Sequence, residues 1–344
     1  MKIGFYCFYQ FYNNNRMFID CSSPIGDDLM YPYVFLGAYL TSKGHQVSTI
    51  DTEPLESYDA IVFLDYPTKF NKYFRKLLSM SDAPTLYLAI WEPKMLRPDN
   101  WLKKNHQFFK KIFTWNTNYV NNTRYIYLPF PNKIERDLAY FDPQRKTKLC
   151  TLIASNKFSN YQGELYSERV NIICWFEKNH PNKFDLYGVD WDRLYIPFLG
   201  RLNFIISAIY RVFPSLPKYT IYKSYKGRVS SKRKVLSQYR FAICFENVSE
   251  PGYITEKIFD CFMAGSIPIY WGASEVLAGF PENTFIDVCR FDSYEELYQY
   301  LDCMSEQEYQ GYLDAIYTFL GSSEIYSWTA ENFASTIEGA IAND

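Results

Sequence analysis

The chain has 344 residues, more than a single hydrophobic core usually holds, so two domains of ordinary size are expected. Hydrophobic residues make up 48% of the sequence and charged residues 22%, close to the averages of globular proteins, which excludes a disordered or fibrous chain. The net charge is −2, and acids greatly outnumber bases from Ser274 onward, which argues against a nucleic-acid partner.

The cysteine and histidine pattern argues against a metal site. The eight cysteines show no metal-type spacing, and the three histidines lie far apart in the sequence, so a His-built site or a Ser-His-Asp triad is not expected. The N-terminal segment is apolar only briefly, and no apolar run reaches the roughly 18 residues of a membrane span. These features predict a cytoplasmic enzyme whose chemistry comes from carboxylates, Arg, Lys and Tyr.

The first part of the chain alternates strand and helix patterns, as in a parallel α/β sheet. Expected helices cover residues 28–43, 71–80 and 101–109. Expected strands cover residues 2–9, 46–51, 59–64, 85–90, 111–115 and 125–128. Together they predict one Rossmann-like domain over residues 1–135.

A polar stretch interrupted by Pro143, residues 136–148, is expected to link this domain to a second one, residues 149–325. Expected strands there cover residues 149–154, 184–187, 241–245, 267–270 and 284–288. Expected helices cover residues 167–178, 232–239, 255–264, 294–304 and 306–319. A last amphipathic helix is expected at 330–341, within a C-terminal segment of residues 326–344.

The glycine pattern argues against two common nucleotide-binding motifs. No G-x-G-x-x-G follows the first strand and no G-x-x-x-x-G-K-[ST] occurs, so NAD-type and P-loop sites lose their main support. The expected fold class is α/β with two Rossmann-like domains facing a central cleft. Such a cleft suits an enzyme that brings a nucleotide-linked donor and an acceptor together, although the fold alone does not establish that use.

The most informative segment, residues 239–272, reads YRFAICFENVSEPGYITEKIFDCFMAGSIPIYWG. It combines F-E-N, G-Y-I-T-E-K, an apolar helix and S-I-P-I-Y-W-G, and this order resembles the signature of the α-1,3-fucosyltransferase family, glycosyltransferase family 10. Weaker collinear matches are LIASN at 152–156 with Arg169 after it, LSQY at 236–239 and WEP at 91–93. The resemblance covers most of residues 85–290.

The resemblance implies a GT-B fold, with an acceptor-binding N-terminal domain and a donor-binding C-terminal domain. It also implies transfer of L-fucose from GDP-β-L-fucose to a hydroxyl of an oligosaccharide or lipid-linked glycan, by a single inverting displacement and with an α-1,3 or α-1,4 linkage. The expected setting is bacterial surface polysaccharide or lipopolysaccharide O-antigen synthesis. No cofactor and no metal ligand is implied, and a divalent metal would act only as a stimulant.

The residues of the signature agree with donor binding. The strand that ends in F-E-N places Asn247 at the cleft, because ligands in open α/β sheets sit at the carboxyl ends of strands. A helix then begins at Thr255, and its N-terminus suits a diphosphate. Lys257 lies in the first turn, where the helix dipole disfavours a cation unless an anion binds there. The alternative is that Lys257 pairs with Glu256 or with an exposed acid.

By resemblance, Lys257 and Arg169 neutralise the diphosphate of the leaving GDP. Glu256 would accept hydrogen bonds from sugar or ribose hydroxyls, and Tyr253 would pack against donor atoms. From the residues alone, Arg169 could equally be a solvated or ion-paired helical residue, Glu256 a partner of the helix dipole, and Tyr253 a residue that fixes a turn.

Glu92 is the candidate catalytic base. It follows the strand TLYLAI and precedes Pro93, which keeps it out of helical geometry and directs it into the cleft. A carboxylate there could take the proton of the attacking acceptor hydroxyl. The alternative is a structural Glu at a turn, in which case Glu246 or Glu53 would be the base.

The stretch at residues 188–235 is longer than expected for a compact relative and has an apolar middle at 202–213. Residues 194–240 carry basic residues and no acid, so one interpretation is peripheral contact of residues 197–235 with the inner membrane. The other is a helix that packs on the domain surface or against a second subunit; the oligomeric state is left open. Two alternatives to GDP-fucose transfer also remain: another nucleotide sugar such as GDP-colitose, and a non-catalytic glycan-binding protein.

Overall fold

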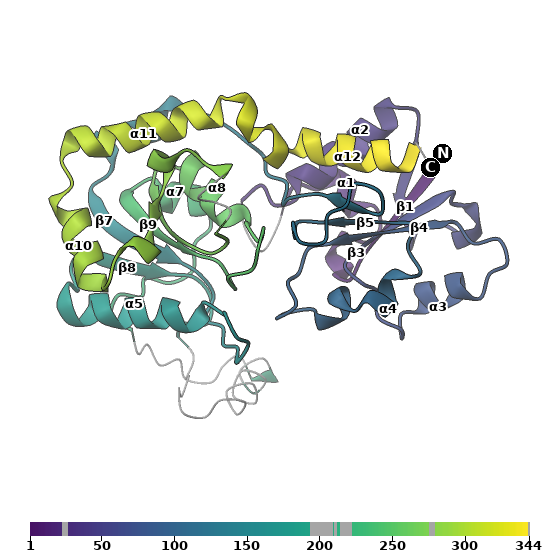
Figure 1. Ribbon diagram of the computed structural model, residues 1–344, viewed down its shortest axis with the longest axis horizontal. Coiled ribbons are helices and arrows are strands. Elements are labelled where there is room, and N and C mark those ends of the chain that lie inside the picture. The colour runs from purple at the N-terminus through teal and green to yellow at the C-terminus, as the bar shows by residue number, and fades with distance from the viewer. Residues whose placement is uncertain (23–26, 193–208, 210–211, 214–221, 275–278, 343–344) are drawn as a thin grey trace.

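The computed structural model describes residues 1–22, 27–192, 209, 212–213, 222–274 and 279–342. These residues form two α/β halves, each built on a parallel sheet with helices on both faces (Figure 1). The α/β class with two Rossmann-like sheets, expected from the sequence, is therefore confirmed. Most of the apolar segment assigned above to a membrane or protein contact lies outside the described residues.

The first half contains a six-stranded sheet in the order β2-β1-β3-β4-β5-β6. Its strands are β1 Lys2–Cys7, β2 Gln46–Thr49, β3 Ala60–Leu64, β4 Thr85–Ile90, β5 Lys111–Thr114 and β6 Tyr125–Tyr127. The central strand β3, AIVFL, is buried at every residue. Such an unbroken apolar run is what a parallel strand covered on both faces requires.

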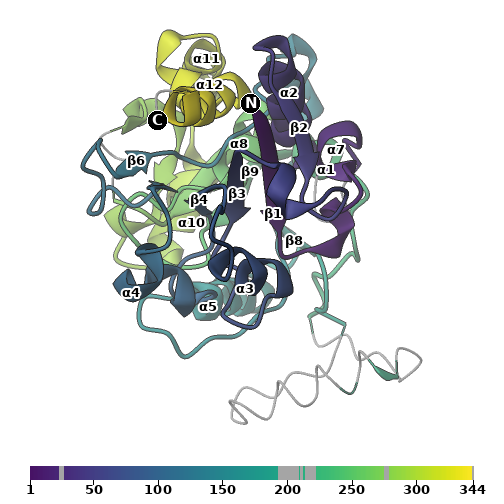
Figure 2. The same ribbon diagram turned by 90° about the vertical axis from the view of Figure 1, so that its right-hand side faces the viewer.

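The helices of the first half are α1 Arg16–Ile19, α2 Tyr31–Ser42, α3 Lys72–Leu78 and α4 Lys103–His106. The last helix of the chain, α12 Ala330–Ala342, also packs on this half, because Phe333, Ala334 and Ile337 belong to its core. Figures 1 and 2 both show α12 lying along α2. The C-terminal segment of the chain thus completes the core of the N-terminal half.

The second half contains a five-stranded sheet in the order β11-β10-β9-β7-β8. Its strands are β7 Lys148–Ile153, β8 Phe184–Tyr187, β9 Tyr239–Phe245, β10 Ile267–Trp271 and β11 Ile286–Asp287. Its helices are α5 Tyr166–Asn179, α7 Lys232–Leu236, α8 Glu256–Met263, α10 Tyr294–Cys303 and α11 Glu306–Leu320. In Figure 1, α5 covers one face of the sheet, and α8 and α11 cover the other.

The predicted length of the helix at residues 101–109 is wrong, because the helix in the structure is shorter. A 3₁₀ turn, Pro98–Trp101, comes first, and α4 then covers only Lys103–His106. The side chains of Asn100 and Trp101 instead donate hydrogen bonds to the carbonyl oxygen of Glu92, at 3.2 and 3.1 Å. These long-range contacts fix the segment in a turn, so tertiary structure overrides its helical pattern.

The chain crosses between the halves twice, and the two crossings pair with each other. The first crossing leads from β6 to β7, and the second leads from α11 to α12. The amide of Asn132 donates to the carbonyl of Trp328 at 2.8 Å, and the amide of Ala330 donates to the carbonyl of Asn132 at 3.1 Å. These two backbone hydrogen bonds join the segments that connect the halves.

A glycine allows the halves to approach closely beside β5. Gly252 has a φ of +77°, and a Cβ atom built on it would lie 2.3 Å from the carbonyl oxygen of Trp115 in the first half. The next residue, Tyr253, is buried with its ring centroid 4.9 Å from that of Trp115 and 5.7 Å from that of Phe130. The turn before α8 is therefore part of the interface between the halves.

Replacing Gly252 with Ala should destabilise the protein, because the new methyl group meets the Trp115 carbonyl and the backbone lies in the left-handed region. We expect a loss of at least about 1 kcal/mol in the free energy of unfolding, measured by urea denaturation. Gly311→Ala is the control: Gly311 lies inside α11 with open space around it, so Ala should add about 0.5–1 kcal/mol. A Gly252→Ala protein as stable as the parent would contradict this account of the interface.

Candidate functional site

A cavity of about 710 Å³ lies between the halves. It is lined by residues that follow the carboxyl ends of β1, β3 and β4 in the first half and of β7, β8 and β9 in the second, together with the start of α8. This is the edge at which open α/β sheets bind ligands. All six residues singled out from the sequence line it: Glu92, Arg169, Asn247, Tyr253, Glu256 and Lys257.

The backbone around Glu92 is held by hydrogen bonds on both sides. The amides of Trp91 and Glu92 donate to Oδ1 of Asp65, at 2.8 and 3.1 Å, and the carbonyl of Glu92 accepts from Asn100 and Trp101. Asp65 follows β3, the neighbour of β4, so its position results from the parallel register of the two strands. These hydrogen bonds fix the backbone from which the Glu92 side chain extends.

The surroundings of Glu92 favour the protonated form of its carboxyl group. Burial raises the pKa of its carboxyl to about 7, and the nearby carboxylate of Asp65 acts in the same direction. Lys157 and Lys257, from the other half, oppose this shift. A carboxyl with a pKa close to the working pH suits a general base.

The two other carboxylates considered as bases occupy different places. Glu246 is fully buried and accepts hydrogen bonds from the amide of Thr255 at 2.8 Å and from its hydroxyl, so it caps the start of α8. Glu53 forms an ion pair with Lys2 and does not line the cavity. Of the three carboxylates, Glu92 is the one at the cavity wall.

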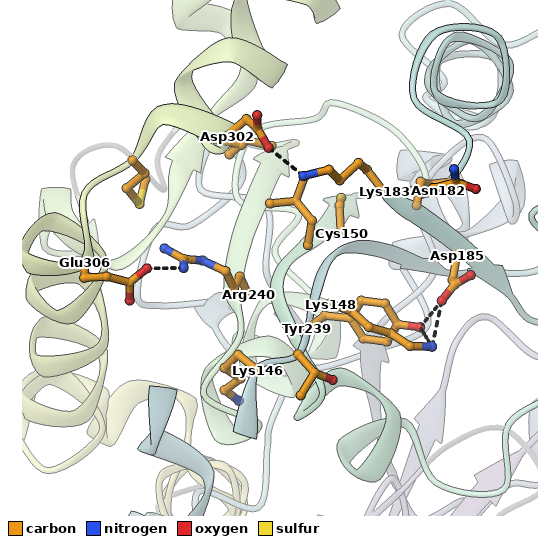
Figure 3. Close-up of a pocket in the computed structure, with 15 residues that line it drawn as sticks. Lys146, Lys148, Cys150, Asn182, Lys183, Asp185, Tyr239, Arg240, Asp302 and Glu306 are labelled. Carbon is orange, nitrogen blue, oxygen red and sulfur yellow. Dashed lines mark hydrogen bonds and ion pairs between the residues drawn. The ribbon is translucent and has the colours of Figure 1, made fainter. Parts of the chain in front are cut away.

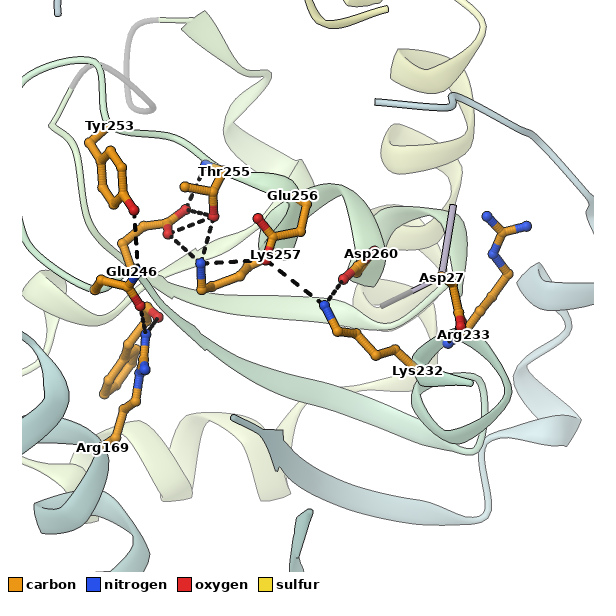
Figure 4. A network of polar contacts seen from close by, with 12 residues as sticks. Asp27, Arg169, Lys232, Arg233, Glu246, Tyr253, Thr255, Glu256, Lys257 and Asp260 are labelled. Atoms are coloured by element: carbon orange, nitrogen blue, oxygen red, sulfur yellow. Dashed lines mark hydrogen bonds and ion pairs between the residues drawn. The ribbon is translucent and has the colours of Figure 1, made fainter. Parts of the chain in front are cut away.

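The start of α8 carries a network of charged groups (Figure 4). Nζ of Lys257 lies 3.0 Å from Oε2 of Glu246, 2.7 Å from the Thr255 hydroxyl and 3.6 Å from Oε1 of Glu256. Burial favours a lower pKa for Lys257, but the carboxylates of Glu246 and Glu256 outweigh it and raise the pKa. Lys257 is therefore a firmly held cation, and the buried Glu246, rather than an exposed acid, is its nearest carboxylate.

Glu256 is held as a carboxylate at the same place. Burial alone would raise its pKa, but Lys257 and Lys232 lower it to about 2. Lys232 lies 2.7 Å from Oδ2 of Asp260 and 3.9 Å from Oε1 of Glu256. An ionised carboxylate is an acceptor only, so Glu256 can receive hydrogen bonds from hydroxyl groups of a ligand.

Arg169 is a buried cation without a counter-ion. Only 3% of the residue is exposed, and its Nη2 donates to the carbonyl of Phe245 at 2.6 Å and to Oδ1 of Asn247 at 3.2 Å. Its Nε has no partner, and no carboxylate among the described residues lies within 4.0 Å of the guanidinium. Burial lowers the pKa of Arg169, and Tyr166 and the carboxylate of Glu246 oppose this shift. A buried, unpaired charge at a cavity wall is costly unless an anion binds beside it.

Tyr253 is fixed by protein contacts. Its ring packs between Trp115 and Phe130, and its hydroxyl oxygen accepts a hydrogen bond from Nδ2 of Asn247 at 3.2 Å. Asn247 thus contacts both Arg169 and Tyr253. The side-chain amide of Asn247 thus links the guanidinium of Arg169 to Tyr253, which packs at the interface between the halves.

Several residues of the cavity were not identified from the sequence. Asp65 could have been found in the same way as Glu92, because it directly follows β3, the strand next to β4. Lys157 directly follows the LIASN segment. Exposed aromatic residues of the first half also line the cavity, and these are Phe8 and Tyr9, which follow β1.

A second cavity, of about 470 Å³, lies at the amino ends of β7 and β9 (Figure 3). Three of its charged groups are neutralised by protein partners: Lys148 lies 2.8 Å from Asp185, Lys183 lies 3.0 Å from Asp302, and Arg240 pairs with Glu306. A fourth, Lys146, donates a hydrogen bond to the carbonyl of Ala264 at 2.7 Å. It lies at the edge opposite to the one at which such sheets bind ligands. The cavity between the halves is therefore the candidate site.

The described residues show neither a metal-binding cluster nor a membrane-spanning helix. Within them, no group of three or more His, Cys, Asp or Glu side chains is arranged to hold a metal ion. Within them too, the helices are too short or too polar for any of them to cross a membrane.

Part of the second half is similar to proteins of known family. Residues 218–329 match the family model for the C-terminal region of glycosyltransferase family 10 (fucosyltransferase). The α-(1,3)-fucosyltransferase FucT of Helicobacter pylori is 30% identical over 162 residues, which are 44% of this chain and 34% of the relative. The α-(1,4)-fucosyltransferase of Arabidopsis thaliana is 41% identical over 66 residues, 19% of this chain and 16% of the relative. The matches thus span about a third or less of these relatives.

Solved structures resemble the whole chain. The crystal structure of an α1,3-fucosyltransferase with GDP superposes with a TM-score of 0.57 and 16% identity, covering 100% of this chain and 91% of the other. Anabaena HepE in complex with UDP and glucose gives a TM-score of 0.54 and 12% identity, covering 100% of both chains. At such identities the likeness shows the fold, which is GT-B. Residues 218–329 are therefore similar to the C-terminal region of glycosyltransferase family 10 (fucosyltransferase), and the chain has the GT-B fold.

Proposed function

We propose that the chain is an inverting glycosyltransferase that moves L-fucose from GDP-β-L-fucose to a hydroxyl of a glycan. The observation that carries the proposal is the unpaired guanidinium of Arg169, which faces the same cavity as Glu92. One wall of the cavity supplies buried cations for a diphosphate, and the opposite wall supplies a carboxylate with a raised pKa for an acceptor hydroxyl. A donor and an acceptor can thus meet between the halves.

The reaction follows from these positions. Glu92 takes the proton of the acceptor hydroxyl as its oxygen forms a bond to C1 of the sugar. The bond from C1 to the phosphate oxygen breaks, and its electron pair stays on the leaving GDP. Arg169 and Lys257 stabilise the charge that develops there, so the proposal requires no metal, and a divalent cation would act only as a stimulant. A single displacement of this kind converts the β-linked donor into an α-linked product.

The similarity to other proteins supports GDP-fucose as the donor. The relatives named above are described as fucosyltransferases, and two structures of an α1,3-fucosyltransferase hold GDP or GDP-fucose. The acidic and basic groups at the start of α8 belong to the region that the family model matches. These findings favour a guanine nucleotide over the uridine nucleotide of HepE.

The setting of the reaction is a further part of the proposal. We place the enzyme in the cytoplasm, peripheral on the inner membrane, where an oligosaccharide or lipid-linked glycan receives an α-1,3 or α-1,4 fucose during synthesis of surface polysaccharide or lipopolysaccharide O-antigen. The basic stretch of residues 194–240, which contains no acid, supports contact with an anionic lipid surface.

The direct test is a donor panel. The purified chain should transfer fucose from GDP-fucose to an N-acetyllactosamine-type or O-antigen-type acceptor, and NMR of the product should show an α-fucoside. Glu92→Gln should bind GDP like the parent in calorimetry, while turnover falls by about two to four powers of ten because the base is lost. Transfer from GDP-colitose alone would change the assigned sugar. Absence of GDP binding would favour a glycan-binding protein instead.

The raised pKa of Glu92 predicts how activity depends on pH. A base must be deprotonated, so kcat/KM should rise as the pH increases through the pKa of Glu92, about 7, and should fall below it. Initial rates between pH 5.5 and 8.5 at limiting acceptor measure this profile. The residual activity of Glu92→Gln should lack the acidic limb. A parent profile that is flat across this range would remove Glu92 from the role of base.

A further inference from the structure

Lys157 is a cation of the cavity that forms no ion pair within the part of the chain that the structure describes. It lies in the loop after β7 and lines the cavity between the halves. Among the described residues, no hydrogen bond or ion pair involves its ammonium group, whereas Lys257 is bound to Glu246 and Lys232 to Asp260. The two neighbouring lysines thus have buried partners, and Lys157 has none.

The backbone that carries Lys157 is fixed. The amide of Ala154 donates to Tyr187 at 3.1 Å, and the amide of Asn156 donates to Val189 at 2.9 Å, so the loop after β7 is joined to the loop after β8. Gly188 permits this approach: its φ is +132°, and a Cβ atom there would lie 1.7 Å from the carbonyl oxygen of Ala154. The position of Lys157 at the cavity is therefore part of the fold.

The charges around Lys157 come from both halves. Desolvation lowers the pKa of Lys157, the carboxylate of Glu92 opposes the shift, and the cations of Lys257 and Arg169 add to it. Glu256 is the remaining carboxylate that faces it. Lys157 thus lines the same cavity as the two cations proposed to hold the diphosphate and the proposed base. Three cations with only partial neutralisation favour binding of a multiply charged anion.

We propose that Lys157 binds the phosphate that is bonded to the sugar, the β-phosphate of the nucleoside diphosphate donor. This inference rests on the proposed function. The β-phosphate is the phosphate nearest to C1, and C1 is the atom that the acceptor oxygen, held by Glu92, must reach. Lys157 shares the cavity with Glu92 and is unpaired among the described residues, whereas Lys257 is already bound to Glu246, so Lys157 is the lysine available to the phosphate next to C1. When the bond between C1 and the phosphate oxygen breaks, the electron pair stays on an oxygen beside Lys157.

The test compares two nucleotides that differ by this phosphate. Calorimetry should measure the Kd of GDP and of GMP for the parent, Lys157→Met and Lys157→Arg. We expect Lys157→Met to raise the Kd of GDP by about tenfold or more, the range for a charged hydrogen bond, and to leave the Kd of GMP within about twofold. Lys157→Arg, which keeps the charge, should retain most of the affinity for GDP. Because Lys157 is exposed, the substitutions should not impair folding.

Lys94→Met is the matched control. Lys94 is an exposed lysine two residues after Glu92 that does not line the cavity, so its loss should change neither Kd. An unchanged Kd of GDP in Lys157→Met, or an equal loss for GDP and GMP, would overturn the assignment to the β-phosphate while leaving the proposed function in place. A parent protein that binds neither nucleotide would overturn the proposed function, and this inference with it.

Discussion

A positive charge buried without a counter-ion is the constraint around which the cavity is arranged. Arg169 is held by a backbone carbonyl and by the side chain of Asn247, two neutral acceptors that fix its direction without cancelling its charge. Neutral acceptors offset only part of the desolvation cost of a guanidinium. Among the described residues, Arg169 thus has no carboxylate partner at the wall between the halves, and the proposed diphosphate would offset the cost of burying its charge.

The start of α8 uses the opposite arrangement, because its charges are already paired. Glu246 occupies the position at which a free helix N-terminus would hold an anion, and it binds Thr255 and Lys257 at the same time. The carboxylate thus fixes the lysine in place and lowers the cost of burying it. The site thus combines Lys257, whose charge is offset by Glu246, with Arg169 and Lys157, which form no ion pair among the described residues.

The sequence predicts those parts of the site that depend on topology. Glu92 and Asn247 could be placed because each follows a strand, and the carboxyl ends of parallel strands meet at one edge. The role of Glu246 could not be predicted, because it depends on a side-chain contact nine residues away and on full burial. The length of α4 was wrong for the same kind of reason: Trp101 is engaged by Glu92 across the fold. Contacts of this kind have no local pattern.

The two paired crossings between the halves restrict how the protein can open. In a chain with one connection, the halves could swing in many directions about a single flexible linker. Here any swing must bend both connections together, and the backbone hydrogen bonds at Asn132 tie them into one two-stranded hinge. A rotation that kept these bonds would have to turn about the paired segments themselves. A fragment cut before α12 would lose both this axis and part of the first core.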